Sequence, residues 1–328
     1  MNAQSTLATV MQLTRDTFRQ AIASGIFWIM LAGTAICVLL CFSVDVSGDV
    51  ALKAEDEPGL FLPRTSKTDP ETARREGVET VSGSMTLAFG AVSFPIARDR
   101  GAAVHFLELC LAWGVAGTIG LLLALVWTAG FVPTFLEPNA AAVLLAKPLA
   151  RWQLLLGKYV GVLTFVALQV ALFVVLTWFA LGIRTDVWDV TYWSCIPLML
   201  LQFAIYYSFS VLIAVFTRST VACVFGSVIF WLLAWGINYG SVIAHGMPES
   251  HSMSSFTLAL TDVAYWISPK PIDAGMILLG ALDADKPMGI TLLDSGQSFS
   301  PQLSILSSFV IAGVLLGLSG YEFSATDY

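Results

Sequence analysis

The sequence is poor in charged residues. Of its 328 residues, 12% are Asp, Glu, Lys or Arg, whereas 57% are hydrophobic and the mean hydropathy is +0.79. A span needs about 20 consecutive apolar residues to cross the hydrocarbon core of a bilayer. Six windows meet or approach that length without a single charged residue: 21–44, 109–132, 159–183, 194–216, 219–244 and 304–321. This pattern excludes a soluble protein and predicts an integral membrane protein.

We therefore expect an all-α fold, a polytopic membrane helical bundle with six transmembrane helices. Residues 1–20 place apolar side chains on one helical face and predict an N-terminal amphipathic interfacial helix. Residues 21–328 then form a single six-span domain, with long outer loops at 45–104 and 245–302. Two short apolar stretches, 85–97 and 275–282, cannot cross a bilayer and predict interfacial or re-entrant segments.

The sequence also has few groups suited to holding a metal. Its five cysteines lie in or beside apolar windows, which favours small buried hydrophobic residues over disulfides or a zinc site. The second outer loop pairs two histidines with two methionines, ligand types that suit copper(I). Such residues in a loop are more often solvated, and the spacing of a closed four-ligand site is missing. We assign no metal site to this set: His245, Met247, His251 and Met253.

Motifs of the common enzyme classes are missing as well. Gly157-Lys158 is followed by Tyr159 and lacks the earlier glycine of a phosphate-binding P-loop. Residues 317–320 match the G-x-S-G of intramembrane serine proteases, a chemistry that needs a histidine beside the serine. All three histidines are predicted at the outer side, whereas Ser319 is predicted at the inner end of the sixth span. We expect no catalytic residue and no directly bound cofactor.

Polar residues within the spans have two interpretations. His105 and Glu108 lie one turn apart at the outer mouth of the second span, where ionisable residues are functional candidates. A side chain near the interface can reach water, so we favour a structural role. Hydroxyl and amide groups in spans four and five could line a substrate path, but we favour hydrogen bonds between helices for Tyr206, Tyr207, Ser208, Ser210 and Asn238. Likewise, helix packing is the favoured role for three small-xxx-small pairs: Gly157 and Gly161, Gly236 and Gly240, and Gly313 and Gly317.

The distribution of basic residues predicts the orientation. Six spans place both termini on one side, and if that side is cytoplasmic, its short segments carry six basic residues: Arg15, Arg19, Lys147, Arg151, Lys158 and Arg218. The short outer loop carries only Arg184. Because basic residues in short loops stay on the cytoplasmic side, we expect cytoplasmic N- and C-termini.

The longest inner segment, residues 133–158, is the most informative stretch. Asn139 can cap a short Ala/Leu helix, Pro148 ends it, and a second helix then begins near Arg151. A partly apolar helix-turn-helix on the cytoplasmic face suits a docking surface for another protein. The alternative from the residues alone is a helix resting on lipid head groups.

This segment resembles that of permeases of type 2 ABC exporters (ABC-2 type). The resemblance rests on an acidic residue, a Leu pair, a Pro, an Arg and a Gly-Lys, which here are Glu137, Leu144, Leu145, Pro148, Arg151 and Gly157-Lys158. The nearest subgroup is the permeases of nitrous-oxide-reductase maturation systems. Two departures from the pattern are residues 140–143, where Gly-Thr is common, and Ala150, where Ser or Thr is common.

The resemblance implies an ABC transporter permease of the inner, cytoplasmic membrane. It implies a coupling helix in the inner segment, with Glu137, Leu144, Leu145, Pro148 and Arg151 contacting a separate ATP-binding subunit that uses the ATP. It also implies a second permease copy or paralogue and contact with the lipid bilayer, but no nucleic acid. The alternative function is a non-transport membrane scaffold that recruits partner proteins through its long loops.

Overall fold

The computed structural model describes residues 14–48, 83–96, 100–136, 151–246, 254–282 and 301–325. Six helical segments in these ranges are long and apolar enough to cross a membrane, which confirms the predicted helical bundle. They are Gly25–Phe42, Ala103–Phe135, Trp152–Thr185, Val190–Thr217, Thr220–His245 and Pro301–Ala325. Each overlaps one of the six charge-free windows of the sequence.

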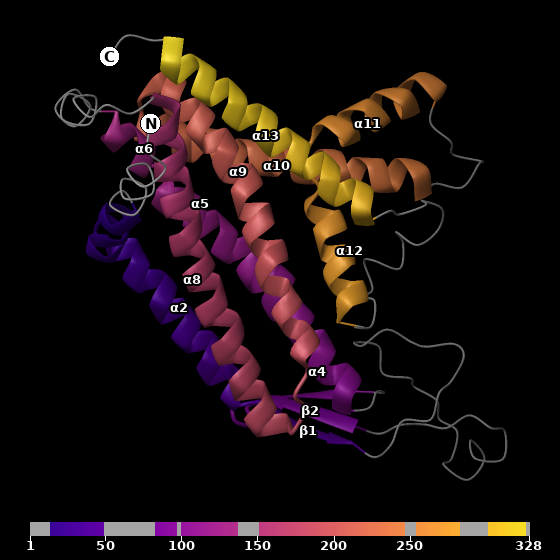
Figure 1. Ribbon diagram of the computed structural model, residues 1–328. Coiled ribbons are helices and arrows are strands. Elements are labelled where there is room, and N and C mark those ends of the chain that lie inside the picture. The colour runs from indigo at the N-terminus through magenta and orange to yellow at the C-terminus, as the bar shows by residue number, and fades with distance from the viewer. Residues whose placement is uncertain are drawn as a thin grey trace.

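The first and third spans pack side by side. Residues 14–23 form a helix, and Ser24 then caps α2 (Gly25–Phe42) by accepting a hydrogen bond from the Ile26 amide. α2 lies along α8 (Arg151–Thr185), the longest helix described (Figure 1). Residues 1–13 of the predicted interfacial helix at 1–20 lie outside the described residues.

The second span is a composite of four helical pieces. α4 (Arg100–Leu109) continues into η1 (Cys110–Gly120), α5 (Leu121–Thr128) and α6 (Phe131–Phe135). η1 has the wider π-helical turn, and the Thr118 hydroxyl accordingly donates to the Trp113 carbonyl five residues earlier, at 3.0 Å. π-helical turns are rare and concentrate at functional sites. The change from π-helix to α-helix carries no signal in the hydropathy, which is high in both η1 and α5.

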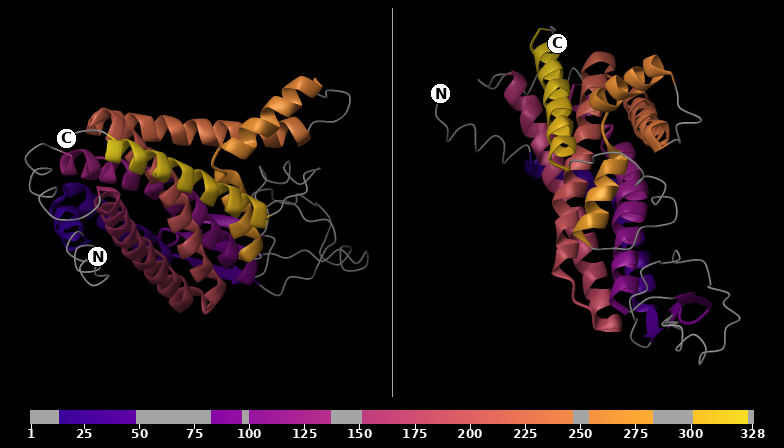
Figure 2. Two further views of the ribbon diagram at one scale, coloured as in Figure 1. Left: turned by 45° about the horizontal axis from the view of Figure 1, so that its top comes forward. Right: turned by 90° about the vertical axis from the view of Figure 1, so that its right-hand side faces the viewer.

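The remaining helices complete the bundle. η2 (Val190–Ser194) leads into α9 (Cys195–Thr217), and a left-handed residue, Arg218, turns the chain into α10 (Thr220–Gly246). α13 (Pro301–Ala325) packs on both α9 and α8. Between α10 and α13, α11 (Ser255–Ile267) packs on α10 and projects from the bundle (Figure 2), whereas α12 (Pro271–Ala281) packs against α9, α10 and α13. α12 is too short to cross, as predicted for residues 275–282.

A small antiparallel sheet was not predicted. β1 (Asp45–Gly48) pairs with β2 (Gly83–Leu87), which pairs with β3 (Val92–Ile96). Most of the segment at residues 85–97, predicted to be interfacial or re-entrant, lies in the hairpin of β2 and β3, and it does not cross the bundle. The buried Met85 packs against apolar side chains at the ends of α2 and α8, so one face of the sheet covers this end of the bundle (Figure 1).

The opposite end of the bundle holds the largest apolar cluster. It joins residues from all parts of the chain, including Ala21 before α2, Leu136 after α6, Leu155 on α8 and Phe323 near the end of α13. Figure 1 places the N- and C-terminal helical ends, together with α6, at this end, far from the sheet. The termini of the described chain therefore share one end of the bundle.

Candidate functional site

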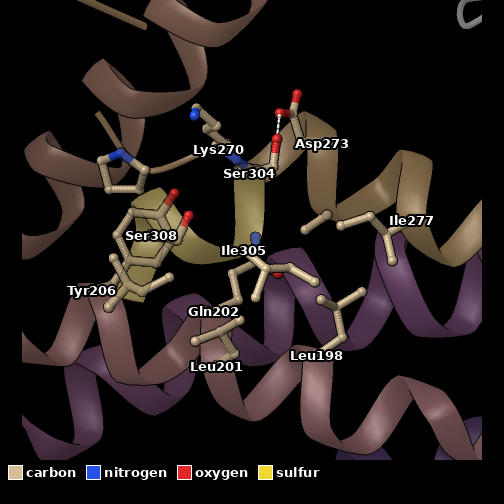
Figure 3. A pocket seen from close by; sticks show the side chains of 14 residues that line it. Leu198, Leu201, Gln202, Tyr206, Lys270, Asp273, Ile277, Ser304, Ile305 and Ser308 are labelled. Carbon is tan, nitrogen blue, oxygen red and sulfur yellow. Dashed lines mark hydrogen bonds between the residues drawn. The ribbon is translucent and has the colours of Figure 1, made fainter. Parts of the chain in front are cut away.

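Polar side chains converge in a hollow where α9, α12 and α13 meet. Gln202 and Tyr206 reach it from α9, Asp273 from α12, and Ser304 and Ser308 from α13 (Figure 3). The cavity has a volume of about 20 Å³, which is room for a single water. A cavity of this size is too small for a substrate. The polar side chains around it instead form a contact between three helices.

Asp273 organises this contact. Its Oδ2 accepts a hydrogen bond from the Tyr265 hydroxyl at 2.5 Å and another from the Ser304 hydroxyl. The carboxylate is buried in the first turn of α12, where the helix dipole favours a negative charge. The interaction links α11, α12 and α13 through one buried acid.

Lys270 stands beside it, buried to a similar degree. Its ammonium donates to the Ser307 hydroxyl at 2.7 Å and lies 3.8 Å from the centre of the Trp266 ring, a cation–π distance. Burial lowers the pKa of Lys270, and the nearby Asp273 carboxylate raises it and so opposes that shift. Burial also raises the pKa of Tyr265, which keeps its hydroxyl protonated as a donor.

A second, larger cavity of about 140 Å³ lies among α2, η1, α5, α8 and α9. Its walls are mainly aliphatic and aromatic, and its polar groups are the hydroxyl of Thr34, the thiol of Cys37 and the amide of Gln169. The Thr34 hydroxyl donates to the Met30 carbonyl within its own helix, at 3.0 Å. Such a cavity suits an apolar group and offers few polar contacts that could select one compound.

Only some of the polar residues in spans four and five form the predicted hydrogen bonds between helices. The Ser208 hydroxyl hydrogen-bonds that of Tyr159 on α8 at 3.0 Å, and the Asn238 side-chain oxygen accepts from the Ile272 amide at 3.0 Å. These two residues join neighbouring elements, as predicted. The buried hydroxyls of Tyr206 and Tyr207, by contrast, have no hydrogen-bond partner among the described residues.

The small-residue pairs divide in a similar way. A Cβ added to Gly161 of α8 would stand 3.1 Å from Oγ1 of Thr17, so this glycine lets the helix of residues 14–23 approach closely, as predicted. Around the other two pairs nothing described lies within 4 Å of an added Cβ: Gly236, Gly240, Gly313 and Gly317. Helix packing within the described chain therefore does not account for these four.

Most residues of the predicted coupling segment, namely Glu137, Leu144, Leu145 and Pro148, lie outside the described residues. Arg151 is the first described residue of α8, so the chain is helical from that position onward. The two flanks of the segment end in the large apolar cluster, which holds Leu136 on one side and Leu155 on the other. Lys158 then donates to the Gln20 side chain at 2.9 Å and so fixes the start of α8 to the helix before α2.

Ionisable residues also meet at the end of the bundle that carries the sheet. His105 and Glu108 lie on α4, and Asp189 precedes η2; Nε2 of His105 is 3.6 Å from Oδ2 of Asp189. The sequence offered no sign of Asp189, because it lies 81 residues beyond Glu108 and joins it only through the packing of η1, α8 and η2.

The His/Met loop is described only at its start. His245 lies in the last turn of α10, with Nδ1 2.9 Å from the Ser241 carbonyl oxygen and Nε2 3.2 Å from Oδ1 of Asp262 on α11. Met247, His251 and Met253 lie outside the described residues. Ser319, the serine of the G-x-S-G match, donates its hydroxyl to the Leu315 carbonyl within its own helix, at 2.7 Å.

Comparison with known families gives one match that covers nearly the whole chain. A family model described as "ABC-2 family transporter protein" matches residues 11–328. No curated protein matches the chain. The matched region takes in all six apolar helices, the sheet, both cavities and the predicted coupling segment.

Proposed function

We propose, from the premise that the chain belongs to the ABC-2 family of transporter proteins, that it exports a substrate by alternating access driven by a separate ATP-binding subunit. Membership in the family makes it a multi-pass membrane protein and the permease subunit of an ABC transporter. The family also implies an ATP-binding partner, and the permease itself is a transport component rather than the catalyst.

The docking site for that partner in this proposal is the segment from Glu137 to Arg151. The observation that supports it best is the arrangement of its two flanks. Leu136 and Leu155 are both buried in the cluster that also holds Ala21 and Phe323, so both ends of the segment are held against the ends of the first and last spans. A displacement of the segment would be transmitted to α2, α8 and α13 together, because the interior of the cluster is close-packed.

We place this end of the bundle in the cytoplasm of a cell whose inner membrane holds the protein. Six basic residues in short segments favour that side, against one in the short loop at the other end, and the charge of long loops has little influence on orientation. Since six spans form half of a usual exporter pore, the assembly includes a second permease copy or a paralogue. We also propose, from the pattern of residues between Glu137 and Lys158, that the chain is related to permeases of nitrous-oxide-reductase maturation systems.

Co-purification tests the proposal. The tagged chain is expressed with a candidate ABC-type ATP-binding subunit from the same organism, and the complex is captured from detergent. The double variant Glu137→Gln, Arg151→Gln should recover the partner at least about tenfold less well, since removing one member of a buried charged contact costs about 2–5 kcal/mol. Asp186→Asn, an exposed acid just after α8 at the opposite end, is the matched control and should leave recovery unchanged.

Equal recovery of the partner by the wild-type chain and the double variant would contradict the docking assignment. If the wild-type chain captures no ATP-binding subunit but retains other proteins through its outer loops, the scaffold function is favoured instead.

A further inference from the structure

Three metal-ligating side chains converge at the sheet end of the bundle, from two segments far apart in the sequence. One donor atom each from His105, Glu108 and Asp189 lies within 4.8 Å of the other two. His105 and Glu108 are one turn apart on α4, so they share a helical face. Asp189 reaches them from the turn between α8 and η2.

Asp189 is held in place by its own neighbours. Its Oδ1 accepts a hydrogen bond from the Thr191 amide at 2.8 Å and so caps η2. That interaction leaves Oδ2 facing His105 at 3.6 Å, with no hydrogen-bond donor among the described residues. One oxygen of the carboxylate therefore orients the residue, and the other is available to a ligand.

Glu108 provides a second and independent observation. Its side chain belongs to the buried set with 1% exposure, yet neither carboxylate oxygen has a hydrogen-bond partner among the described residues. A buried carboxylate without a partner costs several kcal/mol, so such groups bind a metal, pair with a cation or take up a proton. Within the described ranges, no lysine or arginine forms an ion pair with Glu108.

We propose that His105, Glu108 and Asp189 form a binding site for one divalent transition-metal ion such as Zn²⁺ or Mn²⁺. Imidazole favours zinc, carboxylates favour manganese, and a mixed set accepts either. Two carboxylates and a neutral imidazole also balance the charge of a divalent ion. At zinc–ligand distances of about 2.0–2.2 Å, tetrahedral donors stand roughly 3.4 Å apart. The observed 3.6 Å between His105 and Asp189 fits directly, and a pair at the 4.8 Å limit must approach by about 1.4 Å.

The surroundings suit a site that joins helices. Buried apolar neighbours such as Leu109, Tyr192 and Cys195 shield it on the bundle side. With three protein ligands, at least one coordination position is left for water. The bound ion ties α4 to the connection between α8 and η2, at the end of the second span where η1 interrupts the regular helix.

Metal binding to the purified full-length chain tests this site. The protein in detergent is stripped with a chelator, dialysed against Zn²⁺ or Mn²⁺, and its metal content and melting temperature are measured. We expect one saturable equivalent and a melting temperature raised by about 5 °C at a hundredfold excess over Kd. Glu108→Gln, Asp189→Asn and His105→Gln should each weaken binding at least tenfold. Asn retains the cap on η2, so Asp189→Asn separates ligation from folding.

His245→Gln is the matched control, because His245 faces a single carboxylate, Asp262, at 3.2 Å without a third described ligand. Its metal content should equal that of the wild type. The site is ruled out if the wild type binds no saturable ion below about 100 µM, or if Asp189→Asn and His105→Gln bind like the wild type. Loss of binding in His245→Gln alone would also overturn it. None of these results depends on ATP-driven transport.

Discussion

The ammonium of Lys158 on α8 lies 2.9 Å from the amide oxygen of Gln20, in the helix that precedes the first span. This hydrogen bond joins two segments 138 residues apart. Lys158 is buried at this contact, and its ammonium also lies 5.4 Å from the centre of the Phe131 ring. The start of the third span is thereby fixed to the entry of the first and to the end of the second, next to the predicted docking segment.

The first prediction concerns this contact. Lys158→Met keeps most of the apolar volume but removes the donor and leaves the Gln20 oxygen without it. We expect a loss of about 1–3 kcal/mol of unfolding free energy, seen as a lower melting temperature in detergent by tryptophan fluorescence. Thr164→Ala is the control, because Thr164 is exposed on the same helix and bonds only its own turn. Equal melting temperatures for the two variants would contradict this role of Lys158.

The second prediction compares two glycines. In Gly161→Ala, the new methyl would stand 3.1 Å from Thr17 Oγ1 and 3.3 Å from Thr14 Cα, so the two helices must separate slightly. We expect a destabilisation of about 1–3 kcal/mol. In Gly236→Ala the methyl meets nothing described within 4 Å, and removing a glycine from a helix interior contributes up to about 1 kcal/mol of stability. Thermal unfolding of both variants measures this difference in stability. A Gly161→Ala protein as stable as Gly236→Ala would refute the close approach of the helix of residues 14–23 to α8.

The third prediction concerns the acid that links α11, α12 and α13. Asp273→Ala leaves the hydroxyls of Tyr265 and Ser304 without their shared acceptor inside a buried contact. The expected cost is about 2–4 kcal/mol. Asp262→Ala on α11 removes an acid that is 51% exposed and pairs with His245, an interaction worth at most about 1 kcal/mol. When the two variants are measured side by side, Asp273→Ala should have the lower denaturation midpoint. Equal midpoints for Asp273→Ala and Asp262→Ala would count against a structural role for Asp273.

Much of the fold follows from the hydropathy of the sequence, because a bilayer accepts only long apolar helices. All six spans were predicted, and their bounds differ from the predicted windows mainly where helices extend beyond the membrane-length core. The hairpin of β2 and β3 was missed because its turn does not look like one. Ala88 and Phe89 adopt φ of 52° and 57°, values that residues with a Cβ seldom take, and only Gly90 hints at it.

The sites were harder to predict than the spans. Glu108 was recognised as an ionisable residue near the membrane, but its burial and its neighbour Asp189 arise from the packing of distant segments. The polar contact around Asp273 was not predicted either, since Tyr265, Asp273 and Ser304 lie on three helices in the last quarter of the chain. The glycine pairs show that one sequence motif can have different surroundings. Gly161 packs against another helix, whereas no described atom lies within 4 Å of a Cβ added at Gly236 or Gly313.

Site-specific photo-crosslinking tests whether an ATP-binding subunit docks on the segment from Glu137 to Arg151. A photoreactive amino acid placed at Leu145, inside the predicted docking segment, is compared with one at Val190, which is 67% exposed near the sheet end of the bundle. We expect a crosslinked band between the permease and the ATP-binding subunit for position 145 and none for position 190. A crosslink at position 190 alone, or equal crosslinking at both positions, would contradict this docking.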